Sequence, residues 1–496
     1  DPGRAGGVDC EHHWPAGHAQ RGALMAGKRP AVMALALLLT VLFFPLAGYS
    51  IAQNQGEWSK PELIYETEAA INYPYVVGDG TGVTHLFWRE FDEDESDSDS
   101  GLQAIIYSND IGGRWNPGRD IIVMKSVVAP AAAVDANGLI HLLWQSTNNT
   151  LYHSLATTES AHSAQGWAQP EPIAATNSSA HIQTGIDNVM HVVFPGIDTT
   201  GVYYIRYDNE THGWSFPVNI SAPASSNTSS DFTRLAIGSD GTLHVVWTEY
   251  LLPGGWPPTG IYYAQSTDGG GTWSRATELE GAGSVQANVA VDSRGRVHVA
   301  WNRMAGIGGR YHRWSEDGGQ SWSPLAEIAP AGQGGTEGPP QLVVDSADAL
   351  HLLTTFNGCA QYATWVEGVW TSPVCISGRE AMASGFIESP TMTVTNGNQL
   401  HAVFWDDRKR LWHATMTTNA PFIPSVALIE SAPPTIAASP AAVEVTQSVA
   451  TPIINLSTAP PGDGELLGPA QALLPAVAIA GALLGFVILI KLLRSR

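Results

Sequence analysis

The sequence is poor in charged residues, and the charge it has is unbalanced. Only 14% of the 496 residues are Asp, Glu, Lys or Arg, and 24 Lys and Arg stand against 46 Asp and Glu, which gives a formal charge of −22. An acidic chain repels a polyanion, so nucleic acid is disfavoured as a partner. Gly (51), Pro (32) and Trp (17) are abundant by contrast. This composition suits many short strands joined by tight turns and suits long helices poorly.

Residues 25–52 have the three parts of a signal peptide. A basic pair opens the segment, a long apolar run follows, and the small residues Ser50 and Ala52 stand where signal peptidase cleaves. We expect translation to start at Met25, which makes residues 1–24 an artefact of gene assignment. The alternative is an anchor that stays uncleaved.

Residues 469–490 are predicted to form a transmembrane helix, because no charge occurs between Glu465 and Lys491. The basic tail 491–496 is then cytoplasmic by the positive-inside rule. A buried core helix is the alternative. The Pro-, Ala-, Ser- and Thr-rich segment 419–468 predicts a flexible or semi-extended stalk. The chain is therefore expected at the cell surface, as a single-pass protein with its N-terminal domain outside.

One phrase recurs along the chain: an apolar strand, a turn often of Asp-x-x-Gly type, then His-x-x-aromatic. Two copies read AAVDANGLIHLLW and AIGSDGTLHVVW. The repeat histidines are His85, His141, His191, His244, His298, His351 and His401. They lie 50 to 56 residues apart, which is a true internal period.

Each period holds four short strands. A third strand such as IYYAQS follows the His-x-x-aromatic strand, and a fourth such as WSFPVNI opens with Trp. Four strands in about fifty residues is the signature of a propeller blade, whereas a sandwich needs no seven like copies and solenoid periods are shorter. We predict an all-β, seven-bladed β-propeller over residues 54–418. Six blades are the alternative if one copy is degenerate.

The order of the segments predicts how the ring closes. Residues 58–64 (WSKPELI) form a fourth-strand phrase with no first three strands before it, and the last copy, 389–416, lacks a fourth strand. We expect the N-terminal strand to complete the last blade, which removes an exposed sheet edge.

The turn between third and fourth strands carries a second motif, as in STDGGGTW and SEDGGQSW. Asp caps a tight turn, Gly allows positive φ, and Trp packs between blades. The motif resembles the Asp box, or BNR repeat, Ser-x-Asp-x-Gly-x-x-Trp, of the sialidase (neuraminidase) superfamily of propellers. In that family the box is structural and lies away from the catalytic face. Its residues here are Ser108, Asp110, Gly112, Trp115, Ser266, Asp268, Gly270, Trp273, Ser315, Asp317, Gly319 and Trp322.

Strand parity places both kinds of turn on one face of the propeller. The resemblance implies a site on the opposite face, at the mouth of the central channel, where the first strands start. Ten residues before each repeat histidine stand Tyr75, Ala131, His181, Arg234, Asn288, Gln341 and Thr391. The third copy reads as about two residues shorter in its turn, which leaves the register of His181 open.

A sialidase needs three arginines around a carboxylate, a tyrosine activated by a glutamate, and an aspartic acid. The resemblance therefore implies as candidates Arg89, Arg234, Arg303, Arg408, Tyr75, Glu90, Glu249, Asp406 and Asp407. The family's Phe/Tyr-Arg-Ile-Pro motif, which carries the first arginine, is absent. The alternative is that these groups form inter-blade salt bridges and a solvated rim.

The long loop 248–260 carries Trp256, a candidate stacking platform for a sugar ring, close to Tyr250. The sequence thus predicts a surface propeller that binds a glycan or a surface protein. An exo-acting glycoside hydrolase of sialidase type is one alternative, and a structural or adhesive protein without catalytic activity is another.

Three further groups of residues are candidates for a disulfide or for metal binding. Cys359 and Cys375 flank a hairpin turn centred on residue 367 and are expected to form a disulfide, with two free thiols as the alternative. The repeat histidines share one position in every blade, so packing and hydrogen bonding explain them better than metal binding. Asp97 and Asp99 in an acidic loop are weak Ca²⁺ candidates, against a solvated insertion. No other cofactor is expected.

Overall fold

The computed structural model describes residues 56–92, 101–197, 201–208, 211–221, 228–252, 255, 257–304, 308–329, 336–356, 358–366, 368–378, 381 and 387–424. The expected signal peptide, membrane span and cytoplasmic tail lie outside these residues, as does the stalk beyond residue 424. In the part of the chain described, no helix is both long and apolar enough to cross a membrane.

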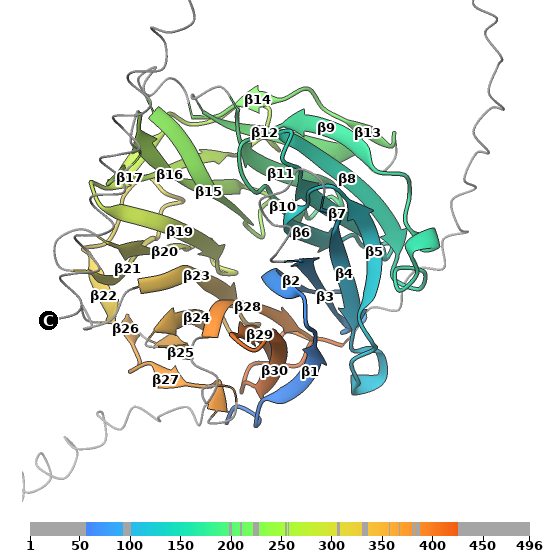
Figure 1. Cartoon of the computed structure of the whole chain (residues 1–496). Helices are drawn as coiled ribbons and strands as arrows, with labels where there is room; N and C mark the ends of the chain where they lie inside the picture. Colours follow the sequence, from blue (N-terminus) through green and yellow to red (C-terminus); the bar gives the residue numbers. More distant parts are fainter. Residues whose placement is uncertain are drawn as a thin grey trace, which may run out of the picture. The chain divides into compact units, whose positions relative to one another are not determined.

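Seven antiparallel sheets surround a common axis (Figure 1). Blade 1 contains β2 (Ala70–Gly78), β3 (Thr84–Phe91), β4 (Gln103–Asn109) and β5 (Arg119–Met124). Blade 2 contains β6 (Val128–Val134), β7 (Leu139–Gln145), β8 (Thr150–Thr157) and β9 (Glu171–Ala175). Blade 3 contains β10 (His181–Thr184), β11 (Met190–Pro195), β12 (Val202–Asp208), β13 (Gly213–Trp214) and β14 (Val218–Asn219).

The other four blades repeat this plan. Blade 4 contains β15 (Thr228–Ile237), β16 (Leu243–Leu251), β17 (Pro258–Ser266) and β18 (Thr277–Glu280). Blade 5 contains β19 (Ser284–Val291), β20 (Val297–Arg303), β21 (Gly309–Ser315) and β22 (Ala326–Ala329). Blade 6 contains β23 (Thr336–Val344), β24 (Leu350–Phe356), β25 (Cys359–Val366), β26 (Val369–Trp370) and β27 (Val374–Cys375). Blade 7 contains β28 (Ile387–Thr395), β29 (Gln399–Asp406), β30 (Arg410–Thr417) and β1 (Glu62–Glu66).

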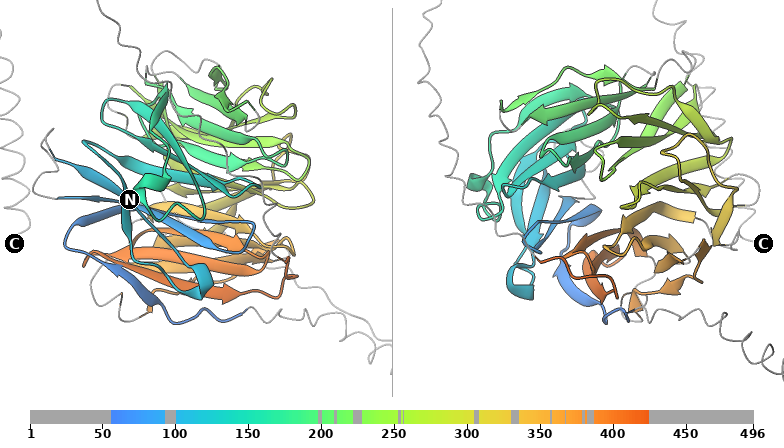
Figure 2. Two further views of the ribbon diagram at one scale, coloured as in Figure 1. Left: turned by 90° about the vertical axis from the view of Figure 1, so that its right-hand side faces the viewer. Right: turned by 180° about the vertical axis from the view of Figure 1, so that it is seen from behind.

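This arrangement confirms the seven-bladed prediction and the predicted closure. β1 pairs antiparallel with β30, with Glu62 opposite His413 and Glu66 opposite Arg410. The first-described and last-described strands therefore lie side by side in one sheet. Two short 3₁₀ turns, η2 (Ile111–Gly113) and η3 (Ala164–Gly166), lie between the third and fourth strands of blades 1 and 2. The side view in Figure 2 shows the strands running between the two faces of the ring.

The second strand of each blade is buried on both sides, which explains its nearly continuous apolar sequence. In β3, Leu86, Phe87 and Trp88 are all 0% exposed. The core therefore lies between blades. Phe87 of blade 1, for example, belongs to the same buried cluster as Ile140 and Trp144 of blade 2.

An aromatic chain links every pair of neighbouring blades. Nδ1 of each repeat histidine lies 2.7–3.2 Å from a Tyr Oη or a His Nε2 on the third strand of its own blade. That ring packs against the Trp that opens the fourth strand of the next blade, with centroids 5.0–6.3 Å apart. The chains are His85–Tyr107–Trp167, His141–His153–Trp214, His191–Tyr204–Trp273, His244–Tyr263–Trp322, His298–His312–Trp370, His351–Tyr362–Trp58 and His401–His413–Trp115.

The Asp boxes of blades 4 and 5 supply the surface that receives these rings. Asp268 accepts hydrogen bonds from the Thr272 N–H and from Ser266 Oγ, both at 2.8 Å. Gly270 has φ +91°, and a Cβ there would lie 2.1 Å from the Tyr204 ring of the preceding blade. Gly319 stands in the same relation to Tyr263, at 2.2 Å. The box therefore forms a surface against which a tyrosine of the preceding blade packs.

The blade 1 box departs from this pattern. Asp110 accepts a hydrogen bond from the Thr84 N–H at 2.6 Å, so its carboxylate joins the box to the second strand of the same blade. Trp115 keeps the expected inter-blade role and donates its Nε1–H to His413 Nδ1 at 3.0 Å.

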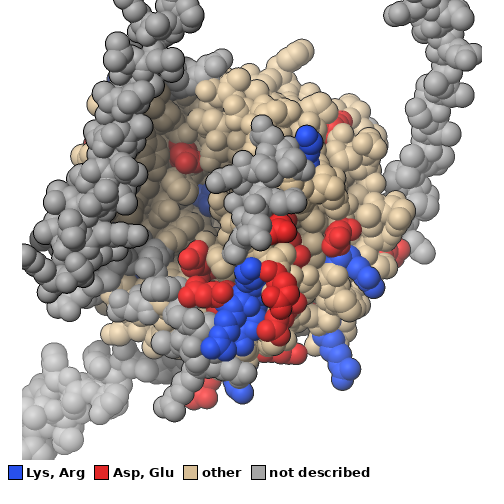
Figure 3. Space-filling model, in the orientation of Figure 1, with Lys and Arg blue, Asp and Glu red and all other residues tan. Residues whose placement is uncertain are grey.

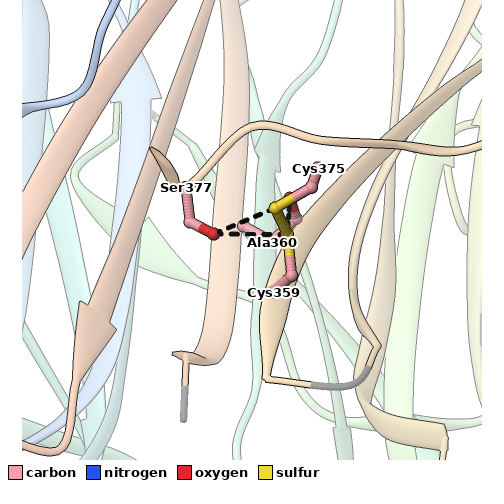
Figure 4. The surroundings of a disulfide bond; sticks show 4 residues. All are labelled: Cys359, Ala360, Cys375 and Ser377. Carbon is pink, nitrogen blue, oxygen red and sulfur yellow. Dashed lines mark hydrogen bonds between the residues drawn. A yellow bond between two sulfur atoms is a disulfide. The ribbon is translucent and has the colours of Figure 1, made fainter. Parts of the chain in front are cut away.

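A disulfide joins Cys359 and Cys375, with Cα atoms 5.9 Å apart (Figure 4). In the ladder Cys375 pairs with Gln361. The cysteines are therefore diagonal neighbours, and the predicted disulfide is confirmed. The fourth strand is interrupted between β26 and β27, which shifts the register. Ser377 Oγ lies 3.3 Å from Cys359 Sγ.

The start of the expected stalk packs against the propeller. The Pro421 carbonyl accepts a hydrogen bond from Ser346 Oγ at 2.5 Å. The Ile423 N–H donates to the Asn396 carbonyl at 2.9 Å. Residues 419–424 therefore lie against turns of blades 6 and 7.

Candidate functional site

A cavity of about 730 Å³ lies on the axis of the ring. All seven first strands line it, namely β2, β6, β10, β15, β19, β23 and β28. In Figure 1 these strands surround the centre of the view. The space-filling view of the same side shows charged groups of both signs gathered over blades 7 and 1 (Figure 3). The described residues that line the cavity include no Asp or Glu, and Arg234 is the one Lys or Arg among them.

The seven residues ten positions before the repeat histidines form one ring of this lining. Tyr75, Ala131, His181, Arg234, Asn288, Gln341 and Thr391 all line the cavity. Each pairs with the residue two positions after its repeat histidine. The sequence therefore identified the ring correctly.

The doubt about His181 is resolved by its turn. In blade 3 the Gly185 N–H donates to the Val189 carbonyl at 2.8 Å. In blade 1 the Asp79 N–H donates in the same way to Val83, at 2.9 Å. Both turns span five residues, so the expectation of a shortened third copy is wrong. The turn only lacks the Asp that opens most of the others.

Arg234, His181 and Tyr75 influence one another electrostatically across the cavity. Burial lowers the pKa of His181 to about 3, and the Arg234 charge adds to this effect. Burial raises the pKa of Tyr75 to about 12, against the opposing effect of Arg234. At neutral pH the imidazole and the phenol are therefore both uncharged, and the guanidinium carries the charge of this trio.

Hydrogen bonding fixes what these groups offer to a ligand. His181 Nδ1 accepts the Leu235 N–H at 3.2 Å, so its proton sits on Nε2. Arg234 Nη1 donates to the Thr233 carbonyl at 2.8 Å, which leaves the other guanidinium N–H groups available. Each of the three therefore presents at least one N–H or O–H donor to the cavity.

Six of the seven first strands, all but β10, carry a bulge toward the mouth of the channel. Tyr73, Ala129, Phe232, Gln286 and Ser389 have φ between +39° and +58° at this bulge. Gly338 occupies the same place in blade 6, with φ +71°. Left-handed backbone is costly for residues other than Gly, and such strain concentrates at binding sites. These residues lie two positions before the ring residues, or three in blade 6, and the sequence analysis did not identify them.

The candidate catalytic acids accept hydrogen bonds from tryptophans of their own blades, and Glu90 also bonds Tyr65 of β1 in blade 7. Glu249 is 2% exposed and accepts the Trp247 Nε1–H at 3.2 Å, and burial raises its pKa. Glu90 accepts the Trp88 Nε1–H at 3.0 Å, and burial likewise raises its pKa.

Asp406 is also committed to its own blade. Its carboxylate is buried and pairs with Arg410 at 2.7 Å. It accepts the Trp412 Nε1–H as well, at 2.9 Å. Asp407, the other candidate, is exposed.

The candidate arginines contrast with these acids. In the part of the chain described, Arg89, Arg234, Arg303 and Arg408 form no ion pair with a carboxylate within 4.0 Å. Arg89 donates to Gln103 Oε1 at 3.1 Å and lies over the Phe91 ring, and Arg408 is exposed. Arg234 alone of the four lines the cavity.

The four remaining candidates were the aromatic residues Trp256 and Tyr250 and the acidic residues Asp97 and Asp99. Trp256, Asp97 and Asp99 lie outside the described residues. Tyr250 is half-buried, and burial holds its pKa well above the usual range. Among the residues described, no group of three or more His, Cys, Asp or Glu side chains could hold a metal ion.

Comparison with known proteins shows similarity in structure only. No protein family model matches the sequence, and no curated protein matches it. An ulvan lyase of polysaccharide lyase family 25, bound to -[GlcA(1-4)Rha3S]-, is 12% identical with a TM-score of 0.51, over 73% of this chain and 96% of its own. The lectin BP39L from Burkholderia pseudomallei is 17% identical with a TM-score of 0.51, over 74% of this chain and 99% of its own.

A sialidase is also among the structural neighbours. The Hadza microbial sialidase Hz136 is 16% identical with a TM-score of 0.41, over 70% of this chain and 65% of its own. At these identities the comparisons establish the propeller fold and nothing finer. The resemblance read from the Asp boxes is thus confirmed at the level of the fold.

Proposed function

We propose that this propeller binds a glycan in the mouth of its axial channel. The observation that carries the proposal is the cavity of about 730 Å³, which is lined by polar side chains from six of the seven first strands. Tyr73 and Phe232 stand at its bulged end. Sites for small ligands combine apolar or aromatic surface with a few fixed polar groups, as this one does.

The structural neighbours support a carbohydrate ligand. One is a lectin and another is a lyase with a saccharide bound, and both share this fold over nearly their whole length. Fold similarity alone does not assign a function, so the proposal rests on the lining of the cavity.

Binding is better supported than hydrolysis. A glycosidase needs two carboxyl groups, or a tyrosine activated by a glutamate, facing the scissile bond. Here Glu249 and Asp406 are hydrogen-bonded within their blades. Tyr75 has a raised pKa, which is the reverse of activation, and no Glu is among the described lining residues. We further propose, from the sequence, that the propeller is displayed at the cell surface on a membrane-anchored stalk.

The test is to screen the purified full chain against neutral and acidic oligosaccharides, beside a variant with a filled channel. Ala131→Phe adds a large ring at a lining position that is 3% exposed, and thermal unfolding of the variant checks that it is folded. Ala168→Phe is the matched control, because Ala168 is exposed near η3. We expect Ala131→Phe to abolish saccharide binding and the control to retain it. Equal binding by both variants, or no saccharide bound by the unmodified chain, would refute the proposal.

A further inference from the structure

The lining of the axial cavity offers hydrogen-bond donors that nothing in the described structure uses. No hydrogen bond within the described residues occupies Tyr75 Oη, His181 Nε2 or the side-chain amides of Asn288 and Gln341. None of these atoms is a buried group without a partner, so all of them reach the open space of the cavity. Interior polar groups are normally bonded, and a ring of free ones therefore needs a ligand or water.

The described residues that line the cavity contribute positive charge only. Arg234 is the one charged residue that lines the cavity among those described, since His181 is neutral in this environment. Asp231, the acid that acts on Arg234, is already occupied: its carboxylate accepts Ser178 Oγ at 2.5 Å and the Phe232 N–H at 2.7 Å. The Arg234 guanidinium forms no ion pair with that carboxylate within 4.0 Å, so its N–H groups that do not bond Thr233 remain available to an anion in the cavity.

The hydrogen-bond donors of the cavity indicate which class of ligand it favours. Arg234 offers a planar fork of N–H groups, which fits a carboxylate or sulfate with two parallel bonds. His181 adds an Nε2–H donor and Tyr75 adds an O–H donor. A neutral sugar hydroxyl satisfies one such donor at a time, whereas an oxyanion accepts several.

We infer that the channel selects saccharides that carry an oxyanion, a uronate carboxylate or a sulfate ester, with Arg234 as its charge partner and His181 and Tyr75 as further donors. This inference rests on the glycan-binding function proposed above and names its ligand class. Aromatic groups at the bulge, Tyr73 and Phe232, face the sugar ring that carries the oxyanion.

The experiment measures binding of three defined ligands to the full chain by calorimetry. They are a glucuronate-containing disaccharide, its neutral glucose counterpart and a sulfated neutral disaccharide. Arg234→Gln removes the charge and keeps a polar side chain. Arg275→Gln is the matched control, because Arg275 is exposed on a fourth-strand segment away from the cavity.

We expect the acidic disaccharides to bind at least tenfold more tightly than the neutral one. Arg234→Gln should remove that preference for the acidic disaccharides, and Tyr75→Phe should weaken acidic binding a few-fold. Arg275→Gln should change nothing. The relative affinity for uronate and sulfate identifies which oxyanion is favoured. Thermal unfolding of each variant confirms that it is folded.

Several outcomes would overturn the inference. Equal affinity for neutral and acidic disaccharides, unaffected by Arg234→Gln, leaves the glycan-binding proposal standing and removes the oxyanion site. Stabilisation by inorganic sulfate that requires Arg234, with no saccharide bound, keeps an anion site and removes both the saccharide ligand and the proposed function. No binding of any of these ligands removes both proposals.

Discussion

Trp58, just ahead of β1, packs edge-on against Tyr362 of β25, with ring centroids 5.1 Å apart and planes inclined at 73°. This contact is the seventh copy of the aromatic chain that joins each blade to the next. The other six tryptophans follow their own blade's third strand, but Trp58 precedes all the blades in sequence. The pair therefore joins the beginning of the described chain to a strand more than three hundred residues later.

Trp58→Ala should weaken this closure. Trp58 is half-buried, so we expect the free energy of unfolding to fall by about 2 kcal/mol, less than the 3–5 kcal/mol typical of a fully buried Trp. Urea denaturation followed by circular dichroism measures it. Phe422→Ala is the control, because Phe422 is 60% exposed. If both variants lose the same small amount, closure does not depend on Trp58.

The propeller should lose stability in acid because of its histidine pairs. Burial lowers the pKa of His413 to about 3 and that of His401 to about 4. The unfolded histidines take up protons near pH 6.5 and the folded ones do not, so stability is complete above pH 6.5 and declines below it. The decline is about 1.4 kcal/mol per pH unit for each histidine.

His413→Tyr tests this account, because four blades already carry Tyr at the corresponding position. The variant should have a shallower loss of stability between pH 6.5 and 4, measured by denaturant midpoints across that range. The exposed His162→Tyr should leave the slope unchanged. An unaltered slope in His413→Tyr would show that the acid sensitivity arises elsewhere; Asp110, 4.0 Å from His401, is the neighbouring titratable group.

Gly270→Ala separates a backbone requirement from a packing requirement. Gly270 and Gly295 both have positive φ, +91° and +78°, but only Gly270 lies against a neighbouring ring. Gly295→Ala should cost about 1–2 kcal/mol, the cost of a left-handed residue. Gly270→Ala should cost more, since its Cβ would overlap Tyr204. Thermal denaturation of the two variants gives the comparison, and equal costs would mean that Tyr204 moves aside freely.

Ala129→Gly should stabilise the channel mouth slightly. Ala129 has φ +43°, so the substitution relieves about 1–2 kcal/mol of strain and adds about 0.5–1 kcal/mol of chain entropy cost. We expect a net gain of about 0.5 kcal/mol in the free energy of unfolding. Ala133→Gly, in the buried part of the same strand, should lose about 0.5–1 kcal/mol. A loss in both variants would show that the bulge is not strained.

The fold could be predicted from the sequence because the same strand pattern recurs seven times along the chain. The histidines mark the second strands, and the unpaired Trp58 phrase marks the closing strand. Local patterns repeated seven times agree with one architecture, which is why the seven blades and the closure could both be predicted.

The sequence predicted only some of the residues at the candidate site. Fixed spacing from the histidines identified Tyr75, His181 and Arg234, because ring symmetry brings equivalent positions to the axis. The same sequence gave no sign that Glu249 and Asp406 are bonded to tryptophans of their own blades, since those contacts depend on side-chain direction. The bulge residues were missed because left-handed φ at Tyr73 or Phe232 contradicts local preference.

The most direct test is a crystal structure of the full chain with a glucuronate-containing oligosaccharide. The account predicts a sugar in the mouth of the axial channel, with its carboxylate within hydrogen-bonding distance of Arg234. A saccharide held at the outer edge of a blade, on the face of the Asp boxes, or in the channel with its carboxylate turned away from Arg234 would contradict it.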